Sequence, residues 1–440
     1  MIKKIFALIL LIAMLTAFIA CESNNATPSG DSIPYESKSG IGDISYRDAY
    51  MTGDSEGVPY EGGGEGEETQ EQDIERAPGQ LTAKALFDND DYDYFYSLGI
   101  KGQTDTGVFY TYQEKFNLTK NRIKVIIENG PLAKVDLLNE NDEVVCTRLA
   151  DKNGVVYLFG EKKDSYKIRV VTNPNDENGY ETFNVENGDT ITLENATTFV
   201  DKIEIALVVD TTGSMGDEIG YLKSELKDVI NKISQNSTNP ISLALIFYRD
   251  EGDEYVTRVK DYSTNIDEQV DYLSKQSAEG GGDFEEAIES AYEKAVNLQW
   301  TTGKTTKILI HVADAPCHDD KVDKCSTYVN KLAEKGVRII NVASSGIDKK
   351  TEYFFRNQCV KTNGCYAFLT DDSGISVGEH LEATINKDLP VEYLNKLLVR
   401  VINGMHTGTY DEAEDIRKNK QDNQQNNKEQ ENIDGEEKTE

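Results

Sequence analysis

The sequence is poor in positive charge: 46 Lys and Arg residues stand against 79 Asp and Glu residues, which gives a formal net charge of −33 over 440 residues. A chain this acidic repels nucleic acid and anionic lipid headgroups, so neither is expected as a partner. The same excess attracts divalent cations and basic surfaces. An acidic, solvated surface that keeps the protein soluble accounts for most of this charge.

Two enzyme signatures are also missing. The sequence contains no H-E-x-x-H motif, the zinc-binding signature of many metalloproteases. Gly303-Lys304-Thr305 looks like the end of a phosphate-binding loop, but Leu298 stands where the first glycine is required. The segment also precedes a predicted strand, whereas a phosphate-binding loop follows one. No nucleotide is therefore expected.

An apolar run near the start, Ile5 to Ala20, follows Lys3 and Lys4 and is broken only by Thr16. It is too short to span a bilayer comfortably, so it predicts a signal peptide over residues 1–20. Phe18-Ile19-Ala20-Cys21 is similar to the lipobox of bacterial lipoproteins, with Phe18 in place of the usual Leu. The resemblance implies lipidation of Cys21 and a protein anchored in the bacterial cell envelope, facing the periplasm or the exterior. Ordinary cleavage and an uncleaved anchor are the alternatives.

Five further cysteines would then lie in an exported chain, where disulfides are favoured. Four of them fall in the last third and allow three pairings. The local pairs are Cys317 with Cys325 and Cys359 with Cys365, whereas Cys146 is expected as a buried strand thiol. A zinc site built from Cys317, His318, Cys325 and a later cysteine is an alternative.

Differences in amino-acid composition mark a tether, a connector and a tail outside the predicted domains. Residues 21–77 are rich in Gly, Ser, Glu and Asp and predict a disordered acidic tether. Residues 78–120 are expected to be a connector whose aromatic residues pack on a neighbouring domain. A calcium site from Asp88, Asp90, Asp91 and Asp93 is disfavoured there, because the glycine and terminal glutamate of an EF-hand loop are missing. Residues 406–440 predict a disordered tail.

Residues 121–199 and 200–405 have different periodicities. Short strands separated by turns, such as Asp151 to Gly154, predict an all-β sandwich over 121–199. The pattern resembles carboxypeptidase-regulatory-like and other immunoglobulin-like modules, and it carries no catalytic constellation. Strands and helices alternate over 200–405, which predicts an α/β fold with a doubly wound, mostly parallel sheet.

The side chains with the clearest ligand-binding potential lie in the segment Ile203 to Met215. A mostly apolar, β-branched strand stops at Asp210, and Thr212 and Ser214 follow at alternate positions before an amphipathic helix. Asp210-x-Thr212-x-Ser214 after such a strand resembles the metal-ion-dependent adhesion site (MIDAS) of von Willebrand factor type A domains.

Later segments match this family in the same order. Gly280-Gly-Gly-Asp283 resembles the second metal loop of a bacterial and extracellular-matrix subset, and Asp314-Ala-Pro follows an apolar strand as the fourth motif does. Tyr248-Arg249-Asp250 and Phe368 to Asp372 match as well. The resemblance therefore implies Asp210, Thr212, Ser214, Asp283 and Asp314 as metal-site residues, although Asp283 just before a helix also suits an N-cap.

Hydroxyl and carboxylate oxygens suit Mg²⁺, with Mn²⁺ or Ca²⁺ as alternatives. Because the hydroxyls of Thr212 and Ser214 are neutral, the ion keeps positive charge for a carboxylate of a partner protein, as the resemblance implies. Direct binding by Asp283 would neutralise the ion further and weaken such a ligand. We therefore expect a membrane-tethered, adhesion-like binding module rather than an enzyme.

Two other classes of function remain open. An envelope scaffold would bind its neighbours independently of the metal. Metal-assisted hydrolysis would need a general base, for which His311 and His318 are the local candidates. His311 lies within a predicted strand and is more often a satisfied core histidine, and His318 is expected at the rim.

Overall fold

The computed structural model describes residues 76–100, 108–173, 176, 178–194, 201–236, 241–302, 305–374 and 379–418. All of them belong to one compact unit, Gln72–Glu440. The predicted signal peptide, the lipidation residue Cys21, most of the tether, Gly303, Lys304 and residues 419–440 lie outside the described residues.

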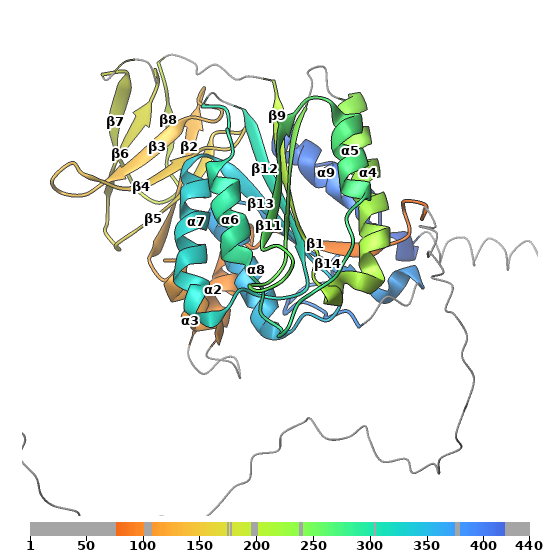
Figure 1. Cartoon of the computed structure of the whole chain (residues 1–440). Helices are drawn as coiled ribbons and strands as arrows, with labels where there is room; N and C mark the ends of the chain where they lie inside the picture. Colours follow the sequence, from red (N-terminus) through yellow and green to blue (C-terminus); the bar gives the residue numbers. More distant parts are fainter. Residues whose placement is uncertain are drawn as a thin grey trace, which may run out of the picture. The chain divides into compact units, whose positions relative to one another are not determined.

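An eight-stranded sheet has the strand order β11-β10-β9-β12-β13-β14-β1-β15 (Figure 1). The five central strands, β10, β9, β12, β13 and β14, run parallel to one another. Strands β11, β1 and β15 pair antiparallel with their neighbours. The strands are β1 (Thr82–Leu86), β9 (Ile203–Asp210), β10 (Ser242–Tyr248), β11 (Thr257–Ser263), β12 (Thr306–Ala313), β13 (Val337–Ala343), β14 (Cys365–Thr370) and β15 (Glu392–Tyr393). The predicted mostly parallel α/β sheet is confirmed.

Helices cover both faces of this sheet (Figure 1). On one face lie α4 (Gly216–Asn236), α5 (Ile266–Ser274) and α9 (Leu394–Thr407), whose apolar residues share a core with the strands. On the other lie α6 (Ile288–Asn297), α7 (Val322–Glu334) and α8 (Lys349–Thr362). Strands buried on both faces are mostly apolar, as in β9 and β12, where all eight residues are buried, including the polar Glu204 and His311.

A smaller β-sandwich precedes the α/β part, as the sequence predicts. One sheet has the order β5-β2-β8 and the other β4-β3-β6-β7. The strands are β2 (Asn121–Glu128), β3 (Lys134–Leu138), β4 (Val144–Leu149), β5 (Val155–Gly160), β6 (Tyr166–Val171), β7 (Tyr180–Val185) and β8 (Thr190–Thr192). Gly154 precedes β5 with φ +79°, and a Cβ there would lie 2.1 Å from the Ile127 carbonyl oxygen, so the turn requires glycine.

Residues 78–120, which the sequence predicts as a connector, contribute directly to the α/β part. Strand β1 pairs with β14, and α2 (Tyr92–Leu98) and α3 (Val108–Lys115) follow it. The aromatic residues of these helices pack on α8, for example Phe109 with Tyr353 at a ring-centroid distance of 4.1 Å. At the other end, Ile416 is buried and its amide donates to the Val391 carbonyl at 2.9 Å, although residues 406–440 were expected to be a tail.

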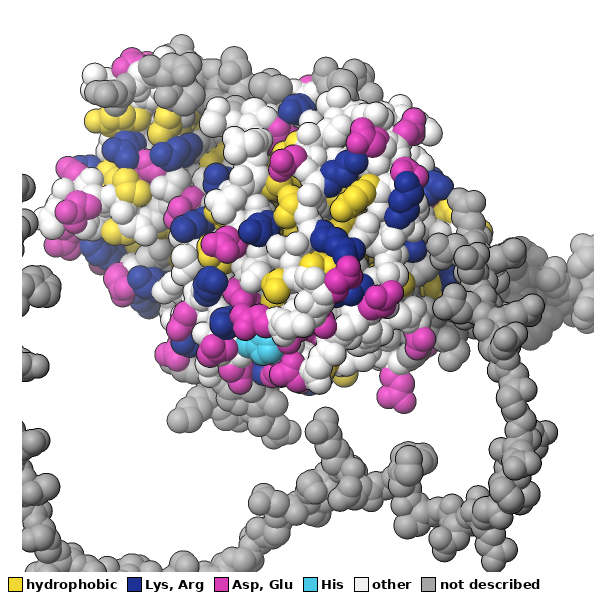
Figure 2. Space-filling model, viewed as in Figure 1, with side chains coloured by type: hydrophobic (Ala, Val, Ile, Leu, Met, Phe, Trp, Pro, Cys, Tyr) yellow, Lys and Arg dark blue, Asp and Glu magenta, His cyan; other side chains and the backbone are white. Residues whose placement is uncertain are grey.

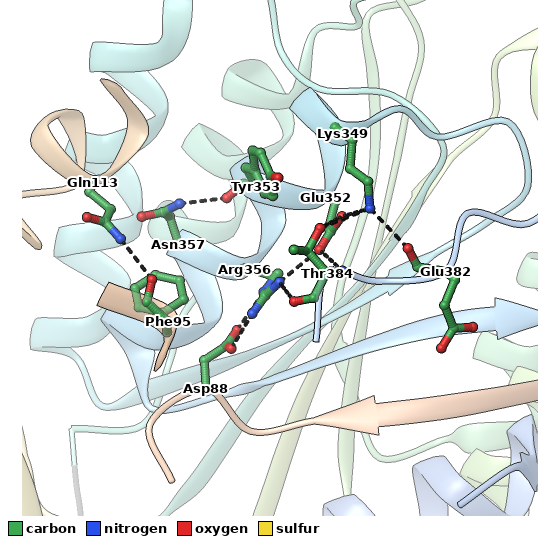
Figure 3. A network of polar contacts seen from close by, with 10 residues as sticks. All are labelled: Asp88, Phe95, Gln113, Lys349, Glu352, Tyr353, Arg356, Asn357, Glu382 and Thr384. Atoms are coloured by element: carbon green, nitrogen blue, oxygen red, sulfur yellow. Dashed lines mark hydrogen bonds and ion pairs between the residues drawn. The ribbon is translucent and has the colours of Figure 1, made fainter. Parts of the chain in front are cut away.

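A buried ionic network ties β1 to α8 (Figure 3). Arg356 has no exposed surface and donates to both carboxylate oxygens of Asp88, at 2.9 and 2.6 Å. It also donates to Glu352 at 2.8 Å and to the Thr384 carbonyl at 2.7 Å. Asp88 is thus a salt-bridge partner of Arg356, and not a member of any described group suited to holding a metal ion.

All five described cysteines are free thiols, so neither predicted local disulfide is formed in this structure. Cys317 and Cys325 are buried side by side, and the Cys359 thiol donates to the Cys365 carbonyl at 3.1 Å. Cys146 is buried in β4, as expected. The alternative zinc site of Cys317, His318 and Cys325 is not formed among the described residues. None of the described helices combines the length and apolar character needed to cross a membrane.

Candidate metal centre

The turn after β9 folds around the carboxylate of Asp210. Its Oδ1 accepts from the Thr212 backbone amide at 2.9 Å and from the Thr212 hydroxyl at 2.7 Å. The Thr212 and Ser214 hydroxyl oxygens lie 3.3 Å apart. The chain then passes through a short 3₁₀ turn, Gly213–Met215, into α4. Three oxygen-bearing side chains therefore leave the carboxyl end of a central parallel strand together, where sheets of this kind bind ligands.

Asp314 reaches the same place from the end of the neighbouring strand β12. A hydrogen bond from the Ser214 hydroxyl lowers its pKa, but burial outweighs this and raises the pKa to about 6. Burial, and then the charge of Asp314, raise the pKa of Asp210 to about 7. The structure thus brings together four of the five predicted residues: Asp210, Thr212, Ser214 and Asp314.

Both aspartates keep a buried oxygen without a hydrogen-bond partner, Oδ2 of Asp210 and Oδ1 of Asp314. Leaving such an atom unpaired costs on the order of 1–3 kcal/mol, more for a charged group. Two adjacent acids in this state have the chemistry of a cation site, because a divalent ion satisfies both oxygens and cancels their repulsion. The oxygen-only donor set fits a hard cation such as Mg²⁺.

Asp283, the fifth predicted residue, is exposed and lies with a different group of side chains. One ligand atom each from Asp250, Asp283 and His318 lies within 4.8 Å of the others, and the same criterion does not group Asp283 with Asp210 and Asp314 among the described residues. Figure 2 shows Asp and Glu side chains gathered around a histidine on the viewed face. The loop carrying Asp283 still adjoins the first turn, since the Gly213 amide donates to the Gly280 carbonyl at 3.1 Å.

Sequence reasoning missed Glu286, three residues after Asp283. It is buried, its Oε2 has no partner, and its pKa is raised to about 9 by burial and then by the charges of Asp210, Asp250 and Asp314. Glu286 therefore adjoins both acidic groups. A carboxylate beside a predicted amphipathic helix was the available signal, but the sequence does not show that Glu286 is buried and does not distinguish it from a first-turn acid that favours the helix dipole.

His311 is the core histidine that its position in a strand predicts. It is fully buried in β12, and its ring nitrogens lie 2.8 Å from the Tyr248 hydroxyl, 3.0 Å from the Tyr292 hydroxyl and 3.0 Å from the Asn341 side-chain oxygen. Burial lowers its pKa to about 4. With its nitrogens fully engaged, His311 is not placed to act as a general base.

The low pKa of His311 predicts a loss of stability in acid. The unfolded chain binds a proton at this residue below its ordinary pKa of about 6.5, while the folded protein stays neutral there down to about 4. Between pH 7 and pH 4 the wild type should lose up to about 3 kcal/mol more than a His311→Gln variant, which cannot titrate. Urea unfolding of both proteins across this range measures the difference, and a constant gap between them would contradict the buried neutral imidazole.

Comparison with known families identifies the fold of this part of the chain. Residues 204–379 match the family model described as von Willebrand factor A domain. The matched segment contains the ends of β9, β10 and β12, and therefore all the side chains described above. Domains of this family generally mediate protein interactions.

Two curated relatives share part of the chain. A putative ariadne-like RING finger protein of Acanthamoeba polyphaga mimivirus is 33% identical over 117 residues, which is 26% of this chain and 11% of that protein. An alpha-protein kinase, vwkA, of Dictyostelium discoideum is 25% identical over 165 residues, 37% of this chain and 26% of that protein. The chain thus spans about a quarter or less of the length of these relatives.

Two solved structures cover 46% of this chain and 98% of their own. They are the conserved hypothetical protein BatB from Bacteroides thetaiotaomicron, with 12% identity and a TM-score of 0.33, and an aerotolerance-related membrane protein from Bacteroides fragilis, with 14% identity and a TM-score of 0.31.

Proposed function

We propose that this chain, whose residues 204–379 form a von Willebrand factor A domain, captures a protein partner through a divalent cation held at the end of its central strands. The observation that carries the proposal is the pair of buried, unpartnered carboxylate oxygens on Asp210 and Asp314 beside the hydroxyls of Thr212 and Ser214. The inference concerns binding, with no chemical turnover.

Asp210, Thr212, Ser214 and Asp314 would hold the ion. When bound, the cation supplies a Lewis-acidic centre that attracts an anionic group. Thr212 is buried and is oriented by its hydrogen bond to Asp210, whereas Ser214 is exposed and faces the side from which a partner approaches. Because both hydroxyls are neutral, they leave the ion positive charge with which to bind a carboxylate of the partner.

The rest of the chain suits a role at the cell envelope. We infer from the leader at residues 1–20 and from Cys21 that a lipid anchors the protein on the outer side of a membrane, with the acidic segment 21–77 as a tether. The sandwich between tether and α/β part then acts as a spacer or platform. In an oxidising compartment the neighbouring Cys317 and Cys325 thiols are the pair best placed to oxidise.

Two features argue against a hydrolase. His311 has no free ring nitrogen, as described above, and the His318 Nε2 is paired with Asp250 at 2.9 Å. His311 therefore cannot activate a water, and His318 groups with Asp250 and Asp283 rather than with the four proposed oxygen ligands.

The proposal is tested by affinity capture with the full chain as bait in an envelope extract of its own cells. Partner recovery in Mg²⁺ should fall about tenfold or more in EDTA and return when Mg²⁺ is restored. Ser214→Ala should show the same loss in Mg²⁺, because it removes a ligand without disturbing the buried core. Quantitative mass spectrometry of the captured proteins gives the readout.

Ser274→Ala is the matched control, since Ser274 is also exposed but lies at the end of α5 and donates to the Asp271 carbonyl. It should capture as the wild type does. If the amount of partner recovered is unchanged both in EDTA and with Ser214→Ala, the proposal is contradicted and a metal-independent scaffold is favoured. Ester or peptide hydrolysis that disappears in Ser214→Ala would favour an enzyme.

A further inference from the structure

Three loops meet beside the first site and bring one imidazole and two carboxylates together. Asp250 follows β10, Asp283 lies on the loop before α6, and His318 lies on the loop after β12. Their ligand atoms all lie within 4.8 Å of one another, and the His318 Nε2 is 2.9 Å from an Asp250 oxygen. Among the described residues, no other set of three histidine, cysteine or acidic side chains meets this spacing.

Hydrogen bonds from backbone amides fix the positions of these three loops relative to one another. The Asp253 carboxylate accepts from the Asp250 amide at 3.1 Å and from the Gly281 amide at 2.9 Å, so one side chain joins the first loop to the second. The Glu286 amide donates to the Pro316 carbonyl at 3.0 Å, which joins the second loop to the third. The three side chains therefore need little further ordering to bind one ligand.

Buried carboxylates with unused oxygens adjoin this cluster. Glu286 and Glu289 are 2% and 1% exposed, and the Oε2 of each lacks a hydrogen-bond partner. Asp250 is among the charges that act on Glu286, and Glu289 is among those that act on His318. Two buried carboxyl groups, each with an oxygen that lacks a partner, therefore lie beside the cluster, and a bound cation would favour their ionised form.

We propose that Asp250, Asp283 and His318 bind a second divalent cation of the transition-metal class, such as Zn²⁺, next to the first site. An imidazole nitrogen with carboxylate oxygens is a donor set that suits Zn²⁺, whereas Mg²⁺ prefers oxygen alone. Three protein ligands leave one tetrahedral position for water or an incoming group. The proposal does not depend on an ion at Asp210 and Asp314, because the two donor sets share no residue.

A second histidine–aspartate pair in the molecule provides a contrast. His406 lies 2.7 Å from Asp201, a separation as short as that of His318 and Asp250, but no third ligand joins it among the described residues. A pair of this kind is an ordinary hydrogen bond between two side chains, and the other His406 nitrogen lies 2.9 Å from the Thr306 hydroxyl. The added carboxylate of Asp283 is what converts the same pairing into a metal site.

The test is a Zn²⁺ titration of the full chain by calorimetry after EDTA treatment and exchange into saturating Mg²⁺. The wild type should bind one Zn²⁺ per chain that Mg²⁺ does not displace. His318→Ala and Asp283→Asn should each weaken this binding at least about 100-fold. Both residues lie in loops outside the core, and far-UV circular dichroism of the variants verifies folding.

Two control variants distinguish Zn²⁺ binding at this cluster from ion binding at the first site and from Zn²⁺ binding by another histidine. Ser214→Ala should retain the Zn²⁺ site while losing Mg²⁺-dependent partner capture, and His406→Ala should retain both. Zn²⁺ affinity unchanged in His318→Ala, loss of Zn²⁺ binding in Ser214→Ala, or full displacement of Zn²⁺ by Mg²⁺ would each overturn the proposal.

Discussion

An Asp88→Ala variant should lose about 3–5 kcal/mol of unfolding free energy, because it leaves the guanidinium of Arg356 buried without its main counter-charge. Arg356 is completely inaccessible, and Asp88 provides two of its hydrogen bonds (Figure 3). Glu352 accepts only one hydrogen bond from Arg356, and it also accepts hydrogen bonds from Lys349 and from the Thr384 amide. Because Asp88 lies two residues after the end of β1, the same change should also loosen that strand from the sheet.

Urea unfolding of the full chain, followed by far-UV circular dichroism, measures this loss. Asp388→Ala is the matched control, because Asp388 also pairs with an arginine through two hydrogen bonds, to Arg417 at 3.1 Å each, but does so in solvent. An exposed pair contributes little, so the control should unfold as the wild type does. Equal effects of the two variants would show that the buried network does not hold β1 and α8 together.

Asp210→Asn should change cation affinity and stability in opposite directions. In EDTA at pH 8 it removes a buried charge that repels Asp314, so stability should rise by on the order of 2 kcal/mol. Mg²⁺ affinity should fall at least about 100-fold, since the neutral amide can no longer balance the ion's charge. In our proposal the repulsion between Asp210 and Asp314 is relieved by the bound metal ion, which the Asp210→Asn variant no longer needs.

Thermal unfolding with and without Mg²⁺ measures both effects. Mg²⁺ should raise the melting temperature of the wild type and leave that of Asp210→Asn unchanged. Asp136→Asn is the control for a buried aspartate that already has partners: it accepts from Arg169 at 3.0 and 2.8 Å and from Thr147 at 2.7 Å. That variant should be destabilised with or without Mg²⁺. A loss of stability in metal-free Asp210→Asn would contradict the cation-site interpretation.

The sequence predicts most of the parallel sheet because fully buried strands such as Ile203–Asp210 contain a continuous apolar run, here Ile205 to Val209. It does not reveal α8, whose residues Thr351 to Thr362 are all buried, including Glu352, Arg356, Asn357 and Gln358. A helix with polar residues on its buried side has no apolar stripe to recognise. The sequence does not reveal strand β1 for another reason, because its pairing with β14 joins residues 280 or more positions apart in the chain.

For the candidate site, too, the sequence predicts the contacts between residues close in the chain or on neighbouring strands, but not those that depend on the folded loops. Asp210, Thr212 and Ser214 lie on one turn, so their proximity follows from spacing alone, and Asp314 follows from the neighbouring parallel strand. Asp283 sits on a long loop whose course depends on contacts such as Gly281 with Asp253, which no local pattern encodes. Its grouping with Asp250 and His318 therefore required the folded chain.

We propose that Asp210, Thr212, Ser214 and Asp314 enclose a divalent cation. Crystals of the protein soaked in Mn²⁺ and measured for anomalous scattering test it most directly, because Mn²⁺ reports the position of the ion and accepts the same oxygen ligands as Mg²⁺. We predict an anomalous peak bounded by these four side chains, absent from Asp210→Asn crystals. Mn²⁺ density found only elsewhere, with both aspartate oxygens hydrogen-bonded to water, would contradict the account.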